Sequence, residues 1–372
     1  MRGPLELLAF GALGTTLAIV PGPTPAAPSA LPLDYPGQAD GNFHVKDFRF
    51  STGERLPEVK LHFVTLGTPQ RDAKGRVTNA VLLLHGTSST SKQWFLPTVA
   101  PELFGPGQPL DPAHWYVIIP DGLGRGGSTK PSDGLKGKFP RYGYVDVVTA
   151  QHMLVTQGLG VDHLRAVIGT SMGGMHAWMW AERYPDLMDA VMPIACQPIA
   201  ITGRSYVVRR ILTESIRNDP DWNGGEYETP PHHWLTSAPL WTIFLDGAVH
   251  LQAEAPTRTA SAALYDRLVD EARKSWDAND FLYWVESQYD YDPQPGLGKI
   301  RAKVIAVNFA DDAINPPDLE IVRKLVEGIP GARFVLVPES AQTQGHLTLR
   351  LAAAWKQYVS ELLVSPERAG AR

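Results

Sequence analysis

The sequence contains a single cysteine, Cys196, among its 372 residues. One thiol excludes an internal disulfide bond, and it also excludes a zinc site built from several cysteines. Cys196 follows an apolar run, which indicates a small buried side chain. Stability is therefore expected to come from a hydrophobic core, for which the 44% of hydrophobic residues are sufficient.

The sequence also lacks a strong charge of either sign. It has 34 Lys and Arg against 39 Asp and Glu, a formal net charge of −5, and no run of basic residues. Nucleic acid is therefore not an expected partner. Neither a metal nor an organic cofactor is expected. Gly122–Gly127 resembles a dinucleotide-binding fingerprint, but Ser-Thr-Lys-Pro follows it where an apolar helix is required.

Long apolar runs are absent after residue 30, so no membrane span is expected in the mature chain. Residues 1–30 differ from the rest, with a short positive start, a largely apolar stretch over residues 5–20 and a segment rich in proline and small residues. This order is typical of a secretory signal peptide, with cleavage near Ala26 or Ala30. Glu6 interrupts the apolar stretch, so an uncleaved anchor is the alternative. A secreted or periplasmic protein is expected.

The most informative segment, Ala166–Gly174, reads Ala-Val-Ile-Gly-Thr-Ser-Met-Gly-Gly. An apolar β-forming run ends there in the pattern Gly-x-Ser-x-Gly, and a helical pattern follows from Met175 to Tyr184. Glycines on both sides allow the sharp turn that exposes Ser171 above a sheet. The N–H of Met172 begins the helix and is expected to stabilise an oxyanion. We interpret Ser171 as a nucleophile, with a plain glycine-rich turn as the alternative.

A nucleophilic serine needs a base and a carboxylate, and in α/β-hydrolases they follow in the order Ser, Asp, His. Asp311 and Asp312 follow one predicted strand, and His346 follows the last one. Only one of the adjacent carboxylates can face the histidine, and we favour Asp312 because Pro316 follows it at the usual spacing. The other is then expected to be a solvated turn residue. After His346 the pattern predicts one amphipathic helix over residues 347–363.

The second oxyanion donor is expected after the third strand. Ala80–Leu84 is the predicted strand, and His85, Gly86 and Thr87 follow it. We assign the donor to the N–H of Thr87, since Gly86 lets the backbone come close. Loss of one such donor raises a barrier by roughly 3 kcal/mol. His85 is expected to brace the loop.

The pattern of strands and helices predicts the fold. Residues 43–50 and 60–66 alternate in polarity as an antiparallel strand pair. From Val81 onward, buried strands alternate with helices, which is typical of a mostly parallel central sheet with helices on both faces. The expected fold class is therefore α/β, with an α/β-hydrolase fold.

The alternation stops after the sixth strand, where helical segments and five tryptophans replace it. We assign residues 43–199 and 298–364 to the hydrolase core and residues 200–297 to a helical lid insertion. A lid excludes water from a site beneath it. Most of the tryptophans are expected to form the core of the insertion itself.

Several segments resemble the homoserine O-acetyltransferase family of α/β-hydrolases, over roughly residues 45 to 362. The matching blocks are Asp121–Thr129, the turn Ser171–Met175, Asp219–Tyr227 with the sequence DPDWNGGEY, and Asp277–Asn279. The resemblance implies a catalytic triad at Ser171, Asp312 and His346, the same residues that the strand pattern indicates. It also implies a homodimer formed through the lid.

Two positions depart from the family pattern. The resemblance implies a lid arginine six residues before the Asp-Pro of the third block, where it holds a substrate carboxylate, but this chain has Thr213. Arg209 lies one helical turn earlier and is a candidate replacement, and Trp222 is a third candidate for substrate binding. The acidic residue that usually follows the histidine is Leu347 here. Because an unpaired buried charge costs roughly 2–5 kcal/mol, these losses argue against a zwitterionic substrate such as homoserine.

The expected function is that of a serine hydrolase that cleaves small or medium uncharged carboxylic esters through an acyl-serine intermediate. The expected partner is thus a small-molecule ester. The first alternative is an O-acyltransferase that passes the acyl group to an alcohol. The second is an inactive binding protein.

Overall fold

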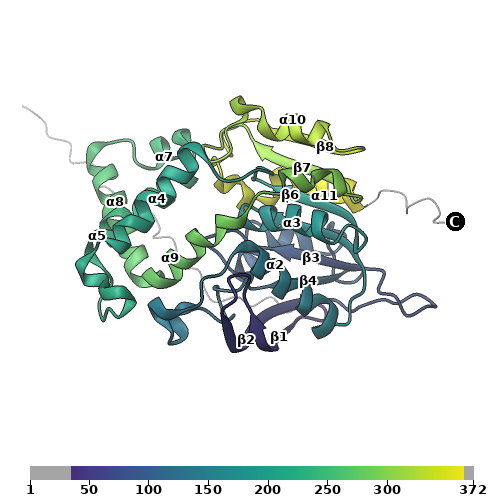
Figure 1. Cartoon of the computed structure of the whole chain (residues 1–372). Coiled ribbons are helices and arrows are strands. Elements are labelled where there is room, and N and C mark those ends of the chain that lie inside the picture. Colours follow the sequence, from purple (N-terminus) through teal and green to yellow (C-terminus); the bar gives the residue numbers. More distant parts are fainter. Residues whose placement is uncertain (1–34, 364–372) are drawn as a thin grey trace, which may run out of the picture. The chain divides into compact units, whose positions relative to one another are not determined.

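A computed structural model describes residues 35–363 of the chain (Figure 1). The predicted signal peptide, residues 1–30, lies outside these residues. Within the described part, no helix combines the length and the hydropathy that a bilayer span requires.

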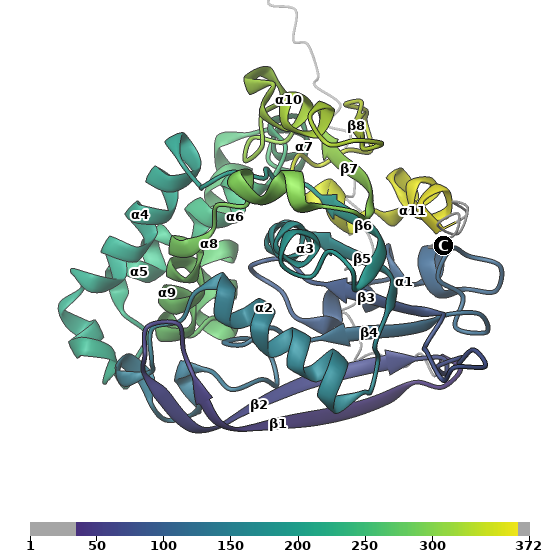
Figure 2. The same ribbon diagram turned by 45° about the vertical axis from the view of Figure 1, so that its right-hand side comes forward.

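One eight-stranded sheet organises the fold, with the strand order β1-β2-β4-β3-β5-β6-β7-β8 (Figure 2). Its strands are β1 (Ala39–Arg49), β2 (Arg55–Leu66), β3 (Ala80–Leu84), β4 (Tyr116–Pro120), β5 (Leu164–Thr170), β6 (Met188–Ile194), β7 (Lys303–Phe309) and β8 (Arg333–Val337). β2 pairs antiparallel with β1 and β4, and the other neighbours pair in parallel. The predicted α/β fold is confirmed, with the expected strand pair as β1 and β2.

The central strands are apolar throughout because helices cover both faces of the sheet. In β3, Leu82 and Leu84 belong to the core beneath the helices that begin at Tyr144 and Met172, whereas Val81 and Leu83 belong to the core beneath the helices that begin at Ala100 and Lys356. The flanking helices are α1 (Ala100–Phe104), α2 (Tyr144–Met153), α3 (Met172–Arg183), α10 (Ile321–Glu327) and α11 (Lys356–Leu363). Two separate apolar layers therefore hold the sheet in place.

The segment between β6 and β7 is helical, and Figure 1 shows its helices grouped beside the sheet. They are α4 (Gly203–Arg217), α5 (His232–Ser237), α6 (Pro239–Leu245), α7 (Ala248–Glu254), α8 (Arg258–Ser275) and α9 (Ala278–Glu286). Their apolar faces form a third cluster around Trp234, Trp241 and Trp284, with Trp222 and Trp276 packed against it. As expected, the tryptophans form a core of the insertion.

The prediction of one continuous helix over residues 347–363 is wrong. The chain instead forms two short 3₁₀ turns, η9 (Leu347–Arg350) and η10 (Ala352–Ala354), before α11. Thr98 causes the interruption, because its hydroxyl donates to the Arg350 carbonyl at 2.7 Å and its own carbonyl accepts the Ala352 N–H at 3.1 Å. The Arg350 carbonyl and the Ala352 N–H therefore bond to Thr98 instead of to partners within a helix.

Candidate active site

Ser171 lies on the turn between β5 and α3, with φ at +53°. This conformation is rare for a residue with a side chain and costs about 1–3 kcal/mol. Glycine is required on both sides of it. A Cβ atom at Gly169 would lie 2.0 Å from the Gly173 carbonyl oxygen, and one at Gly173 would lie 2.1 Å from that of Leu84. The backbone thus presents the hydroxyl at the carboxyl edge of the sheet.

The structure brings together the three residues that the sequence selected. The Nε2 atom of His346 lies 2.8 Å from Oγ of Ser171, and its Nδ1 atom lies 2.7 Å from Oδ2 of Asp312. All three side chains are buried. They follow β5, β7 and β8, whose carboxyl ends meet at one edge of the sheet. The geometry suits a proton relay from serine to histidine, with the carboxylate behind the ring.

Asp312 is held as an anion by several donors. Burial alone would raise its pKa, but the charge and hydrogen bond of His346 and two hydrogen bonds from Asn315 outweigh burial and lower the pKa. Oδ1 accepts the N–H groups of Ile314 at 2.7 Å and Asn315 at 3.1 Å, and Oδ2 accepts the Asn315 amide at 2.9 Å. An ionised Asp312 favours the tautomer with the proton on Nδ1 of His346, which leaves Nε2 free to accept.

Asn315 was not singled out from the sequence. Its amide also donates to the Ala195 carbonyl at 2.9 Å, which ties the Asp312 loop to the end of β6. An asparagine before a proline is typical of any turn, so the sequence carries no signal for this role.

Asp311 is not the solvated turn residue that was expected. It is half-buried, and its Oδ2 atom accepts the N–H of Gly345 at 2.8 Å. Gly345 directly precedes His346 and has φ at +58°. The two adjacent aspartates therefore hold the histidine segment at two points, one at the ring and one at the backbone.

The loop after β3 lies against the serine. A Cβ atom at Gly86 would come within 3.5 Å of Cβ of Ser171, and Thr87 is buried beside it. Met172 is the first residue of α3, so its N–H has no acceptor within the helix. Met172 follows Ser171 directly, and Thr87 follows the glycine that lies against it, so the assignment of their N–H groups as oxyanion donors stays a prediction.

Gln93 fixes the position of this loop, although no sequence motif marks it as a functional residue. Its side-chain oxygen accepts the Gly86 N–H at 3.0 Å, and its amide donates to the Thr170 hydroxyl at 2.7 Å. Gln93 is 4% exposed, so both bonds are shielded from water. One side chain therefore joins the loop after β3 to the serine turn.

His85 braces the same loop, as expected. Its Nε2 atom accepts the N–H of Gly122 at 2.9 Å, and Nδ1 donates to the Gly86 carbonyl at 2.8 Å. Burial lowers the pKa of His85 to about 4. The ring is therefore neutral near pH 7 and able to make both bonds.

Residues 79–342 match the family model described as the alpha/beta hydrolase fold. The chain belongs to the α/β-hydrolase family. The hydrolase is also similar to solved structures. One is an acetylester hydrolase from Corynebacterium glutamicum, with a TM-score of 0.75 and 24% identity over 88% of this chain and 96% of that one.

Three curated relatives align with most of the chain. It is 30% identical to a probable acyltransferase of Methanothermobacter thermautotrophicus over 82% of this chain and 91% of the relative. It is 28% identical to a homoserine O-acetyltransferase of Thermobifida fusca, over 87% of this chain and 93% of the relative. It is 29% identical to a probable esterase of Corynebacterium glutamicum, over 80% of this chain and 86% of the relative. The resemblance to homoserine O-acetyltransferases is thereby confirmed, and the relatives include both acyltransferases and esterases.

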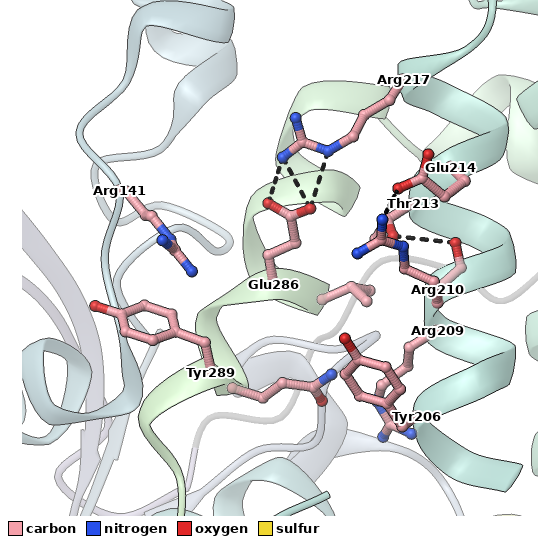
Figure 3. A pocket seen from close by; sticks show the side chains of 11 residues that line it. Arg141, Tyr206, Arg209, Arg210, Thr213, Glu214, Arg217, Glu286 and Tyr289 are labelled. Carbon is pink, nitrogen blue, oxygen red and sulfur yellow. Dashed lines mark hydrogen bonds and ion pairs between the residues drawn. The ribbon is translucent and has the colours of Figure 1, made fainter. Parts of the chain in front are cut away.

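The three candidate substrate-binding residues of the hydrolase lie in the insertion. Arg209 and Thr213 line a cavity of about 480 Å³ on α4, and its lining includes neither Ser171 nor His346 (Figure 3). Trp222 donates its indole N–H to Asn279 at 2.8 Å, a contact within the insertion. Within residues 35–363, none of the three forms a hydrogen bond with Ser171 or His346, and their part in substrate binding stays a prediction.

Proposed function

We propose that the hydrolase cleaves small or medium uncharged carboxylic esters, with Ser171 as nucleophile, His346 as base and Asp312 as the residue that orients the base. The observation that carries this proposal is the unbroken pair of contacts from Ser171 through His346 to Asp312, at 2.8 and 2.7 Å. Groups at these separations transfer a proton without rearrangement.

In the first half-reaction, Oγ of Ser171 attacks the ester carbonyl while Nε2 of His346 takes the hydroxyl proton. The N–H groups of Thr87 and Met172 stabilise the oxyanion that forms. The imidazolium, stabilised by Asp312, then protonates the departing alkoxide. The products of this half-reaction are a free alcohol and an acyl-serine.

In the second half-reaction, His346 removes a proton from water, and the resulting hydroxide attacks the acyl-serine. The tetrahedral intermediate collapses, His346 returns the proton to Oγ of Ser171, and the carboxylic acid leaves. The enzyme regains its starting state.

The surroundings of the histidine favour an uncharged substrate. Leu347 follows His346 directly, and Ile314 lies between Asp312 and Asn315 in the chain. Both belong to the apolar cluster of the insertion. A charged group bound beside them would lose its hydration without gaining a partner.

An O-acyltransferase is the second candidate, favoured by two of the three relatives and by the burial of the site. Ser171 is 8% exposed and His346 is 2% exposed. A site closed to bulk water gives an alcohol acceptor an advantage over hydrolysis. We further propose that the insertion acts as the lid that maintains this closure.

Turnover of p-nitrophenyl acetate and butyrate, with and without added alcohols and acyl-CoA, separates these functions. The proposal expects hydrolysis in water alone that is lost in Ser171→Ala. Acyl transfer from CoA far above hydrolysis would instead establish the acyltransferase. Absence of turnover, together with no labelling of Ser171 by a fluorophosphonate probe, would contradict both.

We also propose secretion or periplasmic location, from the composition of residues 1–30, and a homodimer formed through the insertion. The exposed apolar side chains of α4 support the dimer, since Tyr206, Val207 and Ile211 are each about half exposed. Light scattering on the wild type and on Ile211→Asp tests it. The dimer predicts a twofold drop in mass for the variant, and a monomeric wild type would refute it.

A further inference from the structure

A cavity of about 480 Å³ lies between the insertion and the loop before α2, and neither Ser171 nor His346 lines it. Its walls are α4, the end of α9 with the following turn η6 (Ser287–Asp290), and the loop before α2. Figure 3 shows Arg141 approaching from one wall and a row of α4 side chains from the other. A cavity of this volume holds a small organic molecule.

The charges that line the cavity do not balance. Four arginines and two glutamates line it, which leaves an excess of two positive charges. Both glutamates are already engaged, because Glu214 pairs with Arg210 at 2.8 Å and Glu286 pairs with Arg217 at 2.6 Å. The excess therefore rests on the two remaining arginines, Arg141 and Arg209.

Arg209 is the stronger sign of a missing anion. It is 4% exposed, and no carboxylate of residues 35–363 pairs with it. Its guanidinium donates to the Ser205 carbonyl at 3.0 Å and lies 5.2 Å from the ring centroid of Trp241. Burial lowers its pKa to about 10, so the group is still charged near pH 7. A buried cation without a counter-ion is destabilising.

Arg141 supplies the second unpaired charge. Its guanidinium lies 4.1 Å from the centre of the Tyr289 ring, and no carboxylate among the described residues forms an ion pair with it. The ring of Tyr289 holds the guanidinium beside the cavity. Tyr206 lines the α4 side of the same cavity.

We propose that this cavity binds a small organic dianion, a dicarboxylate or a phosphate monoester, at a site separate from the serine. Two unpaired guanidinium groups match two negative charges, and guanidinium is the side chain best suited to carboxylate and phosphate oxygens. The cavity is much larger than inorganic phosphate needs, which favours an organic ligand. This site does not depend on the proposed ester hydrolysis.

Calorimetric titration of the whole protein at low ionic strength tests the proposal, with succinate and phenyl phosphate as probes. One of the two is expected to bind with one-to-one stoichiometry, whereas neutral succinamide is expected not to bind. Arg141→Gln and Arg209→Gln should each weaken binding about tenfold or more, because each removes a charge-assisted hydrogen bond. Arg76→Gln, an exposed arginine on another loop, is the matched control and should bind like the wild type.

Further experiments test the location of the binding site and the class of ligand that it takes. Binding should persist in Ser171→Ala, and saturating succinate or phenyl phosphate should leave the KM of p-nitrophenyl acetate unchanged. Arg209→Gln removes an unpaired buried charge, so its melting temperature should not fall. Competitive inhibition of ester hydrolysis by either dianion would show that the site is not separate from the serine. Binding of inorganic phosphate alone would show that the ligand is not an organic dianion. Unchanged affinity in both arginine variants, or no binding of either dianion to the wild type, would overturn the proposal altogether.

Discussion

Oδ2 of Asp312 lies 2.7 Å from Nδ1 of His346, while the neighbouring Asp311 reaches only the backbone one residue earlier, at the N–H of Gly345. Two adjacent carboxylates thus serve one histidine in different ways. One sets the tautomer of the ring, and the other holds the segment that carries the ring. Because the two carboxylates contact different atoms, substituting each one tests separately the orientation of the His346 ring and the position of its backbone segment.

Replacement of Ser171 by alanine should abolish ester hydrolysis and labelling by a fluorophosphonate probe. The melting temperature should stay nearly unchanged, because the substitution removes one hydroxyl and keeps the same strained backbone position. Calorimetry alongside the p-nitrophenyl acetate assay checks both statements. Activity near that of the wild type would assign the nucleophile to another residue.

Asp312→Asn should lower kcat by about 10⁴-fold, because the amide favours the wrong tautomer of His346. Asp311→Asn is the matched variant next to it. Its amide oxygen still accepts the Gly345 N–H, so we expect a loss of no more than about tenfold. Steady-state kinetics of both variants make the comparison, and the reverse order of effects would exchange the roles of the two aspartates.

The elements that were predicted correctly are those in which local pattern and tertiary structure agree. The run before Ser171 is apolar because it is a central strand, and its glycines are required by backbone contacts at about 2 Å. A strand, a turn and a helix in this order around Ser171 are compatible with few other backbone arrangements. The same argument from strand ends indicated the pair Asp311 and Asp312, and the spacing to Pro316 then favoured Asp312.

The errors concern contacts between distant parts of the chain. The helix after His346 is interrupted by Thr98, which lies about 250 residues away in the sequence. Asp311 is partly buried because a backbone N–H from another loop comes to it. Gln93 is likewise an ordinary polar residue until the fold places Gly86 and Thr170 on either side of it. Local periodicity contains no information about such contacts.

His62 should make stability depend on pH above about 6.5, the pKa of an unfolded histidine. The hydrogen bond from His62 to Asp121, at 2.8 Å, raises the pKa of the histidine in the folded state. Protonated His62 therefore stabilises the fold fully below its unfolded pKa of about 6.5, and this contribution is lost as the pH rises through the higher folded value. The melting temperature of His62→Gln should thus lie furthest below that of the wild type near pH 6.

The difference between His62→Gln and the wild type should shrink toward pH 9. His114→Gln, at an exposed position, is the control and should follow the wild type across this range. A difference that stays constant from pH 6 to pH 9 would show that the His62 charge does not contribute.

Gln93→Leu should reduce kcat by up to about a hundred- to a thousandfold, the range seen when an oxyanion donor is lost, and should change KM little. Leucine keeps the bulk of the side chain, but it leaves the Gly86 N–H without its acceptor and frees the loop from Thr170. Because Thr87 follows Gly86 directly, its N–H then no longer has a fixed position beside Ser171. Gln157→Leu, at an exposed position, controls for the loss of an amide elsewhere. An effect of Gln93→Leu on melting temperature alone, with kcat unchanged, would restrict Gln93 to stability and remove it from the positioning of the oxyanion loop.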